Sequence, residues 1–191
     1  MKAEEKFKDH IISILVYNKP GVAAKICGLI TRRGFNIESF NGGKEKDKDM
    51  FRIVIVVKGD DRSIEQIQKQ LNKVLETVKV TPIDQKYKVE REMALVKIKL
   101  SDGSRNDIFQ LVEIFKGKIV DTHPAGIVAE ITGTTEKIDA FIDLIPNNSL
   151  LMISRSGIVA MNRWAKTASS EYKRYKEADN GKNLHRTGCR S

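Results

Sequence analysis

The apolar residues of this chain alternate between strand-like runs and helical spacing in one particular order, and that order occurs twice. In the first half, runs rich in Val, Ile and Phe predict strands at 11–17, 35–40, 50–57 and 78–83. Apolar residues at helical spacing predict two helices between them, one with Pro20 at its first position and Gly34 after its end. The second opens at 60–63, with Ser63 and Gln66 as a capping box, and runs to Val78. The predicted order is βαββαβ.

The second half repeats this order without repeating the sequence. Strands are predicted at 94–100, 118–122, 126–132 and 150–154, the last with a continuation through 158–160, and helices at 104–115 and 134–142. The pattern predicts an α+β chain of two consecutive ferredoxin-like βαββαβ domains with antiparallel sheets. We place the first domain at 1–84 and the second at 85–161, with the charged residues 84–92 as a linker.

Several predicted strands are apolar on both faces, most clearly at residues 53–57. The two helices of a βαββαβ unit cover one face of its sheet, so the other face needs a second cover. The sequence therefore predicts that this face or the sheet edge pairs with another copy of the chain.

Residues 162–191 lose the periodicity and hold over half of the net charge of +9. We expect this basic tail to be partly disordered, with an optional helix over 165–178 and disorder over 179–191. The rest of the chain is only mildly basic, which argues against a surface that tracks nucleic-acid phosphates.

The sequence contains no recognisable catalytic constellation. His10, His123 and His185 have no Cys, Ser or carboxylate at motif spacing, and no glycine-rich phosphate loop follows a strand. Cys27 and Cys189 are isolated, so neither a metal site nor a disulfide is predicted. No run of eighteen apolar residues and no signal peptide are present, so we expect no membrane span and a cytoplasmic location.

One segment stands out as a candidate binding site, namely Asn18-Lys19-Pro20-Gly21-Val22, which joins the first strand to the first helix. A helix N-terminus offers unpaired N–H groups and partial positive charge, which suit a carboxylate. Gly21 lets a ligand approach the backbone, and Asn18 offers a donor and an acceptor. The alternative is a plain turn, and Asn36 likewise has two interpretations: a ligand group, or a residue that tolerates the left-handed conformation after a helix.

These residues resemble a known family. The loop, followed by an Ile-rich helix and by Arg33-Gly34-Phe35-Asn36-Ile37-Glu38-Ser39, resembles the ACT domain, a βαββαβ module that binds amino acids at subunit interfaces. Four further blocks at 66–71, 89–97, 114–121 and 154–157 extend the likeness to the regulatory small subunit of acetolactate synthase. The tail after Asn162 is longer and more basic than the family's usual ending.

The resemblance implies a non-catalytic regulatory subunit in branched-chain amino acid biosynthesis. Such a subunit binds the catalytic large subunit, raises its activity and confers feedback inhibition by valine. Thiamine diphosphate, FAD and magnesium belong to the large subunit, so this chain is expected to hold no cofactor. The ACT domains are expected to form a homodimer with valine between the copies. The implied ligand residues are Asn18, Pro20, Gly21 and Val22 of one copy with Asn36 and Ile37 of the other.

Two alternatives stay open at this point. The ACT blocks also permit a stand-alone amino-acid sensor, although the blocks after residue 89 favour the synthase partner. The βαββαβ order is also that of the RNA-recognition fold, but the strand at 50–57 has one aromatic residue, Phe51, and no aromatic block for base stacking. The choice among valine, isoleucine and leucine is left open, because one methylene changes binding by only about 1–3 kcal/mol.

Overall fold

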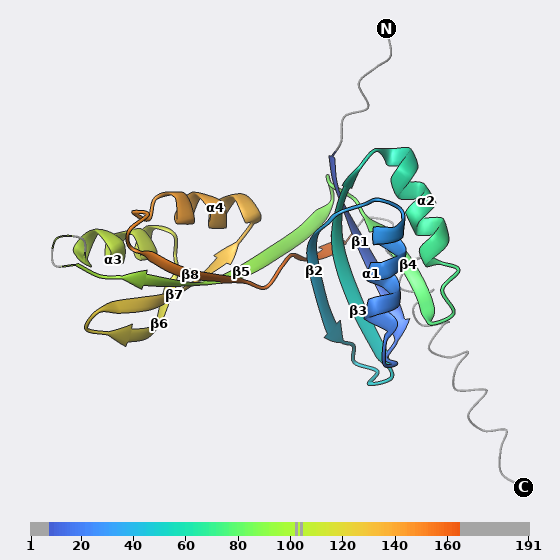
Figure 1. Ribbon diagram of the computed structural model, residues 1–191, viewed down its shortest axis with the longest axis horizontal. Helices are drawn as coiled ribbons and strands as arrows, with labels where there is room; N and C mark the ends of the chain where they lie inside the picture. Colours follow the sequence, from blue (N-terminus) through green and yellow to red (C-terminus); the bar gives the residue numbers. More distant parts are fainter. Residues whose placement is uncertain (1–7, 102, 104, 165–191) are drawn as a thin grey trace, which may run out of the picture.

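The computed structural model describes residues 8–101, 103 and 105–164. It confirms two successive βαββαβ units with antiparallel sheets (Figure 1). The first unit consists of β1 (Lys8–Tyr17), α1 (Val22–Arg32), β2 (Ile37–Lys44), β3 (Met50–Gly59), α2 (Asp61–Leu71) and β4 (Thr77–Ile83). Its sheet has the order β2-β3-β1-β4. The central strands β3 and β1 carry the most fully buried runs, at 53–57 and 11–14.

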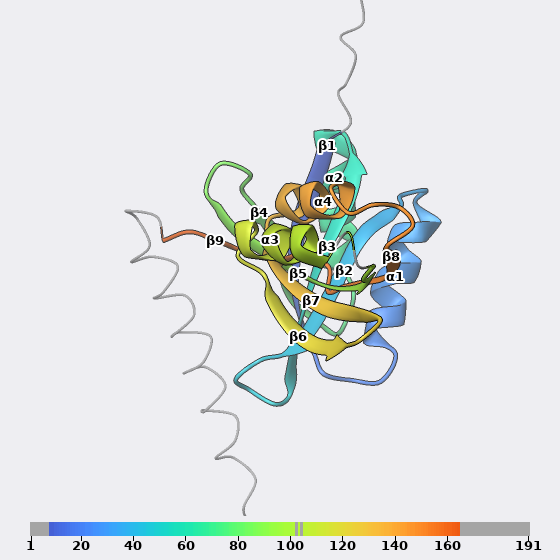
Figure 2. The same cartoon turned by 90° about the vertical axis from the view of Figure 1, so that its left-hand side faces the viewer.

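The second unit has the same topology. It consists of β5 (Lys88–Lys99), α3 (Arg105–Ile114), β6 (Lys118–His123), β7 (Gly126–Gly133), α4 (Thr135–Asp143) and β8 (Leu150–Arg155), in the sheet order β6-β7-β5-β8. Figure 2 shows α3 and α4 side by side over one face of this sheet. A short last strand, β9 (Val159–Asn162), pairs with the start of β5.

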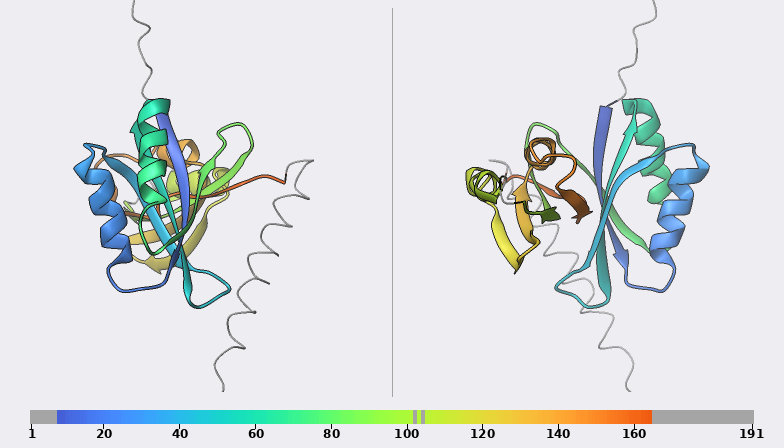
Figure 3. Two further views of the ribbon diagram at one scale, coloured as in Figure 1. Left: turned by 90° about the vertical axis from the view of Figure 1, so that its right-hand side faces the viewer. Right: turned by 60° about the vertical axis from the view of Figure 1, so that its left-hand side comes forward.

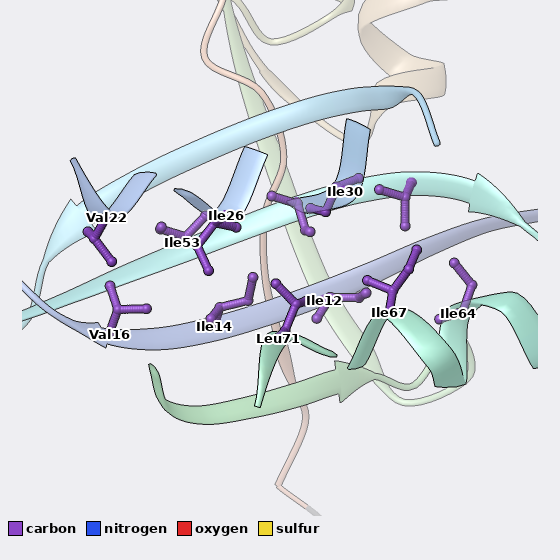
Figure 4. Packing of buried hydrophobic residues seen from close by; sticks show 12 residues of the cluster. Ile12, Ile14, Val16, Val22, Ile26, Ile30, Ile53, Ile64, Ile67 and Leu71 are labelled. Carbon is purple, nitrogen blue, oxygen red and sulfur yellow. The ribbon is translucent and has the colours of Figure 1, made fainter. Parts of the chain in front are cut away.

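Each unit has its own core between its sheet and its helices. In the first unit, Ile12 and Ile14 of β1 meet Ile26 and Ile30 of α1, and all four side chains are fully buried (Figure 4). Burial of an Ile side chain contributes about 1.5–3 kcal/mol to stability. In the second unit, Phe141 is fully buried and packs edge-on against Phe115 at 5.4 Å between ring centroids. The alternation of each strand therefore places one face of each sheet beneath its helices.

The opposite face of the first sheet is partly covered by the chain itself. Ala160 of β9 and the preceding Ile158 pack against Ile11, Val54 and Val56. Figure 3 shows that α1 and α2 lie on the side of this sheet that faces away from the second unit. The first sheet thus has the second apolar face that the sequence predicted, and residues of the same chain cover part of that face.

The structure corrects several element boundaries. The predicted linker at 84–92 already contains β5 from Lys88, because β9 gives these charged residues a pairing partner. The second helix ends at Leu71 rather than Val78, and Leu75 beyond it is 88% exposed. The predicted last strand does not run on through 158–160. Left-handed Gly157 separates β8 from β9.

Helix α1 begins later than predicted, and helix α2 begins within the predicted range 60–63 but with a different capping residue. Helix α1 begins at Val22, so Pro20 lies in the turn before it and Gly21 is the N-cap residue. In α2 the cap is Asp60, whose carboxylate accepts from the Ser63 N–H at 2.8 Å and from its hydroxyl at 2.6 Å. These hydrogen bonds lower the pKa of Asp60. The N-cap is thus three residues before the predicted Ser63, and its carboxylate satisfies the N–H of the third helical residue.

The tail prediction falls mainly on residues 165–191, which lie outside the described residues. Its first residue, Asn162, belongs to β9, and its side chain accepts a hydrogen bond from the Asp84 N–H at 2.9 Å. Within the described residues, none of the helices combines the length and apolar character needed to span a bilayer.

Candidate functional site

The loop between β1 and α1 exposes the N-terminus of α1 without a side-chain cap. Gly21 is the N-cap residue, with φ 80° and ψ −5°, and no acidic residue lies in the first turn. The left-handed conformation is open to glycine at little cost. The leading N–H groups of α1 therefore keep their partial positive charge without a protein carboxylate against them.

Asn18 ties this loop to the hairpin between β2 and β3. Its main-chain N–H donates to the Asp49 carbonyl at 2.8 Å, and its side-chain Nδ2 donates to the Lys48 carbonyl at 3.3 Å. The hairpin thus holds the end of the loop that adjoins β1. The geometry gives Asn18 a supporting role in the loop in addition to any contact with a ligand.

The residues around Gly21 differ in what they present to solvent. Pro20 is exposed, whereas the Val22 side chain is 5% exposed and lies in the core beside Val16 (Figure 4). A Cβ added to Gly21 would have no neighbouring atom within 4 Å, so space exists above the helix N-terminus. The Val22 side chain therefore does not face a ligand in this loop, and the Val22 N–H donates to the Lys19 carbonyl at 3.3 Å.

Two lysines near the loop, Lys25 and Lys19, already have side-chain contacts. Lys25 in α1 contacts the Glu76 carboxylate, with 2.5 Å between Nζ and Oε1, and this hydrogen bond lowers the pKa of Glu76. The Lys19 ammonium lies 5.9 Å from the centroid of the Tyr17 ring. A carboxylate bound at this loop would thus depend chiefly on the helix N-terminus itself.

The other two predicted ligand residues lie at the opposite end of α1. Gly34 takes the left-handed conformation at φ 79°, as the sequence predicted, and Asn36 Nδ2 then donates to Glu38 Oε1 at 3.0 Å. Ile37 is half-buried at the start of β2. Because α1 has eleven residues, its ends are about 16 Å apart. One chain does not bring the two halves of the predicted site together.

Two cavities lie elsewhere in the described structure. One, of 410 Å³, opens on the outer face of the first sheet beside β9 and is lined by residues that include Arg52, Thr81 and Trp164. The other, of 530 Å³, lies between the two units and is lined by residues that include Lys58 and Arg155. Neither contains a predicted ligand residue. No set of three His, Cys, Asp or Glu side chains within the described ranges could hold a metal ion.

Sequence reasoning missed a charged network in the second unit. Arg155 of β8 donates from Nε and Nη2 to the two carboxylate oxygens of Glu92, at 2.8 and 2.7 Å, and from Nη1 to Asp139 at 2.7 Å. The Glu92 hydrogen bonds raise the pKa of Arg155. The only signal in the sequence was that Arg155 and Glu92 each fall within a block that resembles the small-subunit family.

Comparisons with known proteins agree with this arrangement. Residues 12–79 match the model of the acetohydroxyacid synthase small-subunit-like ACT domain, and residues 91–164 match the model described as the small subunit of acetolactate synthase. The two matches correspond to the two βαββαβ units and together span most of the described residues.

The matches to curated relatives extend over nearly the whole length of those proteins. The chain is 44% identical over 159 residues to the probable acetolactate synthase small subunit of Methanothermobacter thermautotrophicus, covering 83% of this chain and 95% of that protein. It is 45% identical over 154 residues to the corresponding protein of Archaeoglobus fulgidus, covering 81% of this chain and 96% of that protein. The crystal structure of the acetolactate synthase small subunit from Thermotoga maritima superposes with a TM-score of 0.79 at 52% identity, covering 83% of this chain and 99% of that one. The chain therefore belongs to the acetolactate synthase small-subunit family.

Proposed function

We propose that this chain is a non-catalytic regulatory subunit that binds the acetolactate synthase large subunit, raises its activity and confers feedback inhibition by valine. Membership of the small-subunit family implies a large catalytic subunit as the partner. The observation that carries the effector part is the N-terminus of α1, which has no side-chain cap, has Gly21 in the left-handed conformation and has open space above it. An amino-acid carboxylate fits that position.

The proposal includes a homodimer through the ACT domains, with the effector between two copies. The separation of the two predicted halves supports it, because Asn36 and Ile37 can reach the Gly21 loop only from another molecule. Pro20 and the backbone of Val22 would line the first half, and Ile37 would supply apolar contact for a branched side chain. The two-copy arrangement also offers a physical route to regulation, since the effector would favour one arrangement of the protomers.

Thiamine diphosphate, FAD and magnesium are proposed to reside in the large subunit. The chemistry of the synthase would then take place outside this chain, which would act on it only through protein contacts. A cytoplasmic location is part of the same proposal.

The RNA-binding alternative is disfavoured by the first sheet. An RNA-recognition sheet stacks bases on aromatic residues of its open face. Here that face carries Ile11, Val54 and Val56, and Ala160 and Ile158 cover part of it. A stand-alone sensor is less economical, because the second unit matches the synthase small-subunit model and not a general ACT module.

The first experiment is a calorimetric titration of valine into the purified chain and into Asn18→Ala and Gly21→Asp variants. The parent is expected to bind valine saturably at the dimer interface. Gly21→Asp is expected to abolish binding because it adds a carboxylate where the ligand carboxylate docks. Gly21→Ala is the matched control, since it has the same backbone strain without the charge and is expected to bind more weakly than the parent but better than Gly21→Asp.

The second arm measures synthase activity of the large subunit with and without this chain and valine. Activation and valine inhibition together would support the whole proposal. Activation with no heat and no inhibition at millimolar valine would refute the valine effector and retain the activating role. An absence of activation and of binding to the large subunit would refute the regulatory role itself. Leucine and isoleucine titrations then rank the side chains.

A further inference from the structure

Two segments more than one hundred residues apart, each in or directly beside a family-like sequence block, meet in the structure. The main-chain N–H of Ile158 donates to Ser39 Oγ at 2.8 Å, and Asn41 Nδ2 donates to the Ser156 carbonyl at 3.0 Å. Gly157 lies between them at φ 75°, and a Cβ there would stand 2.8 Å from Ser39 Oγ. Only glycine therefore fits this position. We call this contact between Ser39, Asn41 and residues 156–158 the clasp.

A β-bulge explains how one strand serves both the predicted effector site and the clasp. The register of β2 against β3 shifts between Ile37, which pairs with Val57, and Ser39, which pairs with Val56. Without the shift, residues two apart would face the same side of the sheet. With it, Ile37 faces the helices, whereas Ser39 and Asn41 face the second unit. Bulges commonly redirect side chains beside functional sites.

The other side of the clasp is anchored in the second unit. Ser156 exchanges two hydrogen bonds with Met93 of β5, from its N–H to the Met93 carbonyl at 2.9 Å and from the Met93 N–H to Ser156 Oγ at 3.1 Å. The preceding residue is Arg155, which bonds Glu92 of β5 and Asp139 of α4. A displacement of the clasp would thus be passed to both β5 and α4.

The boundary between the units beside the clasp is not closely packed. The 530 Å³ cavity there is lined by residues of the first unit such as Glu38 and Val56, and by residues of the second such as Thr135 and Arg155. A tightly filled interface would resist small rearrangements, because protein interiors are close-packed. Here the hydrogen bonds of the clasp, together with the apolar contact of Ile158 and Ala160 with the first sheet, hold the units in register.

We propose that the clasp couples the effector state of the ACT domain to the position of the second unit, with Ser39 and Asn41 as positioning residues. The inference rests on the proposed function, since it takes Asn36 and Ile37 as effector contacts. Ser39 lies two residues beyond Ile37 on the same strand. An effector that holds the start of β2 in one arrangement would fix the clasp, and an effector can shift the equilibrium only by its differential affinity for the two arrangements.

The test uses the complex of the full chain with the catalytic large subunit. Asn41→Leu and Ser39→Ala each remove one hydrogen bond of the clasp, and Ser39→Thr keeps the hydroxyl. We expect the first two to bind valine with the parent stoichiometry and to activate the large subunit, but to inhibit less at saturating valine. The ratio of free to valine-inhibited activity is expected to fall roughly 2- to 30-fold, the range for residues on a coupling path. Ser39→Thr is expected to retain inhibition.

The matched control is Asn162→Ala. Asn162 also joins the two units, through hydrogen bonds with the Asp84 N–H and the Pro82 carbonyl, but it lies away from β2. The Asn162→Ala variant is therefore expected to keep the valine inhibition of the parent. Hydrogen exchange adds a direct readout, because valine should slow exchange of the Ile158 amide in the parent and not in Ser39→Ala.

Parent-like valine inhibition in Asn41→Leu and Ser39→Ala would overturn the proposed coupling through the clasp. An equal loss of valine inhibition in Asn162→Ala would also overturn it. If Asn41→Leu does not assemble with the large subunit, the comparison of Ser39→Ala with Ser39→Thr decides the question by itself. A parent complex that does not respond to valine would contradict the proposed function, and that result is separate from either outcome for the clasp.

Discussion

An Arg155→Met substitution is expected to destabilise the second unit, because it leaves the Glu92 carboxylate without its guanidinium partner. Glu92 loses hydrogen bonds of 2.8 and 2.7 Å and keeps the Thr135 hydroxyl at 3.1 Å. Its side chain is 6% exposed, so water replaces the lost donors poorly. Removal of one partner of a fully buried pair costs about 3–5 kcal/mol. Because Arg155 is 33% exposed, we expect roughly 2–4 kcal/mol here.

Urea unfolding of the purified chain, followed by circular dichroism, measures this cost. Substitution of the other partner, Glu92→Gln, leaves a partly exposed Arg155 that still bonds Asp139. The loss in free energy of unfolding should therefore be smaller, about 1–2 kcal/mol. The double variant should be more stable than the sum of the two losses predicts, by at least about 1 kcal/mol. The predicted role of Arg155 would be refuted if the free energy of unfolding of Arg155→Met lay within about 0.5 kcal/mol of the parent value. A smaller loss in Arg155→Met than in Glu92→Gln would refute it as well.

Three further predictions concern the first unit. Gly34→Ala should lower the free energy of unfolding by about 1–2 kcal/mol because of its φ of 79°, whereas Gly28→Ala inside α1 should raise it by about 0.5–1 kcal/mol, and both sites have open space for the methyl group. Urea midpoints that shift in the same direction would contradict this. The Asp60 carboxylate has a lowered pKa because the Ser63 hydroxyl and N–H donate to it, so its contribution is present above about pH 4 and is lost as pH falls through its folded pKa. Melting temperatures from pH 6 to 3 should therefore fall more for the parent than for Asp60→Asn. Burial raises the pKa of the Cys27 thiol, so iodoacetamide at pH 8 should alkylate it more slowly in the folded chain than in urea, as followed by mass spectrometry.

The core elements were predictable because local spacing determines them. The strands at 11–17 and 50–57 and the helix through Ile26 and Ile30 carry their own apolar period, and the structure has them close to the predicted bounds. The start of β5 was not predictable in this way. Lys88 and Glu90 face the first sheet as a partly buried ion pair, with 2.6 Å between Nζ and Oε2, so their charges resembled those of a solvated linker.

The candidate site was predictable only in part. The uncapped helix start after Asn18 follows from a glycine and a proline in sequence, and the left-handed Gly34 follows from its place at a helix end. The bulge between Ile37 and Ser39 left no local signal, because a single extra residue in an edge strand changes no composition. The contact of Ser39 with Ile158 spans 119 residues, and such pairings depend on how the two units sit together rather than on any local pattern.

The cover of the first sheet by Ile158 and Ala160 has a consequence during synthesis on the ribosome. The first unit is complete at Ile83, but its cover is encoded about 75 residues later. At a translation rate of about 5–20 residues per second, Ile11 and Val56 stay uncovered for roughly 4–15 s. The nascent ACT unit thus passes through a period in which its outer face can bind a chaperone or another nascent chain, and that period ends only when the last strand emerges.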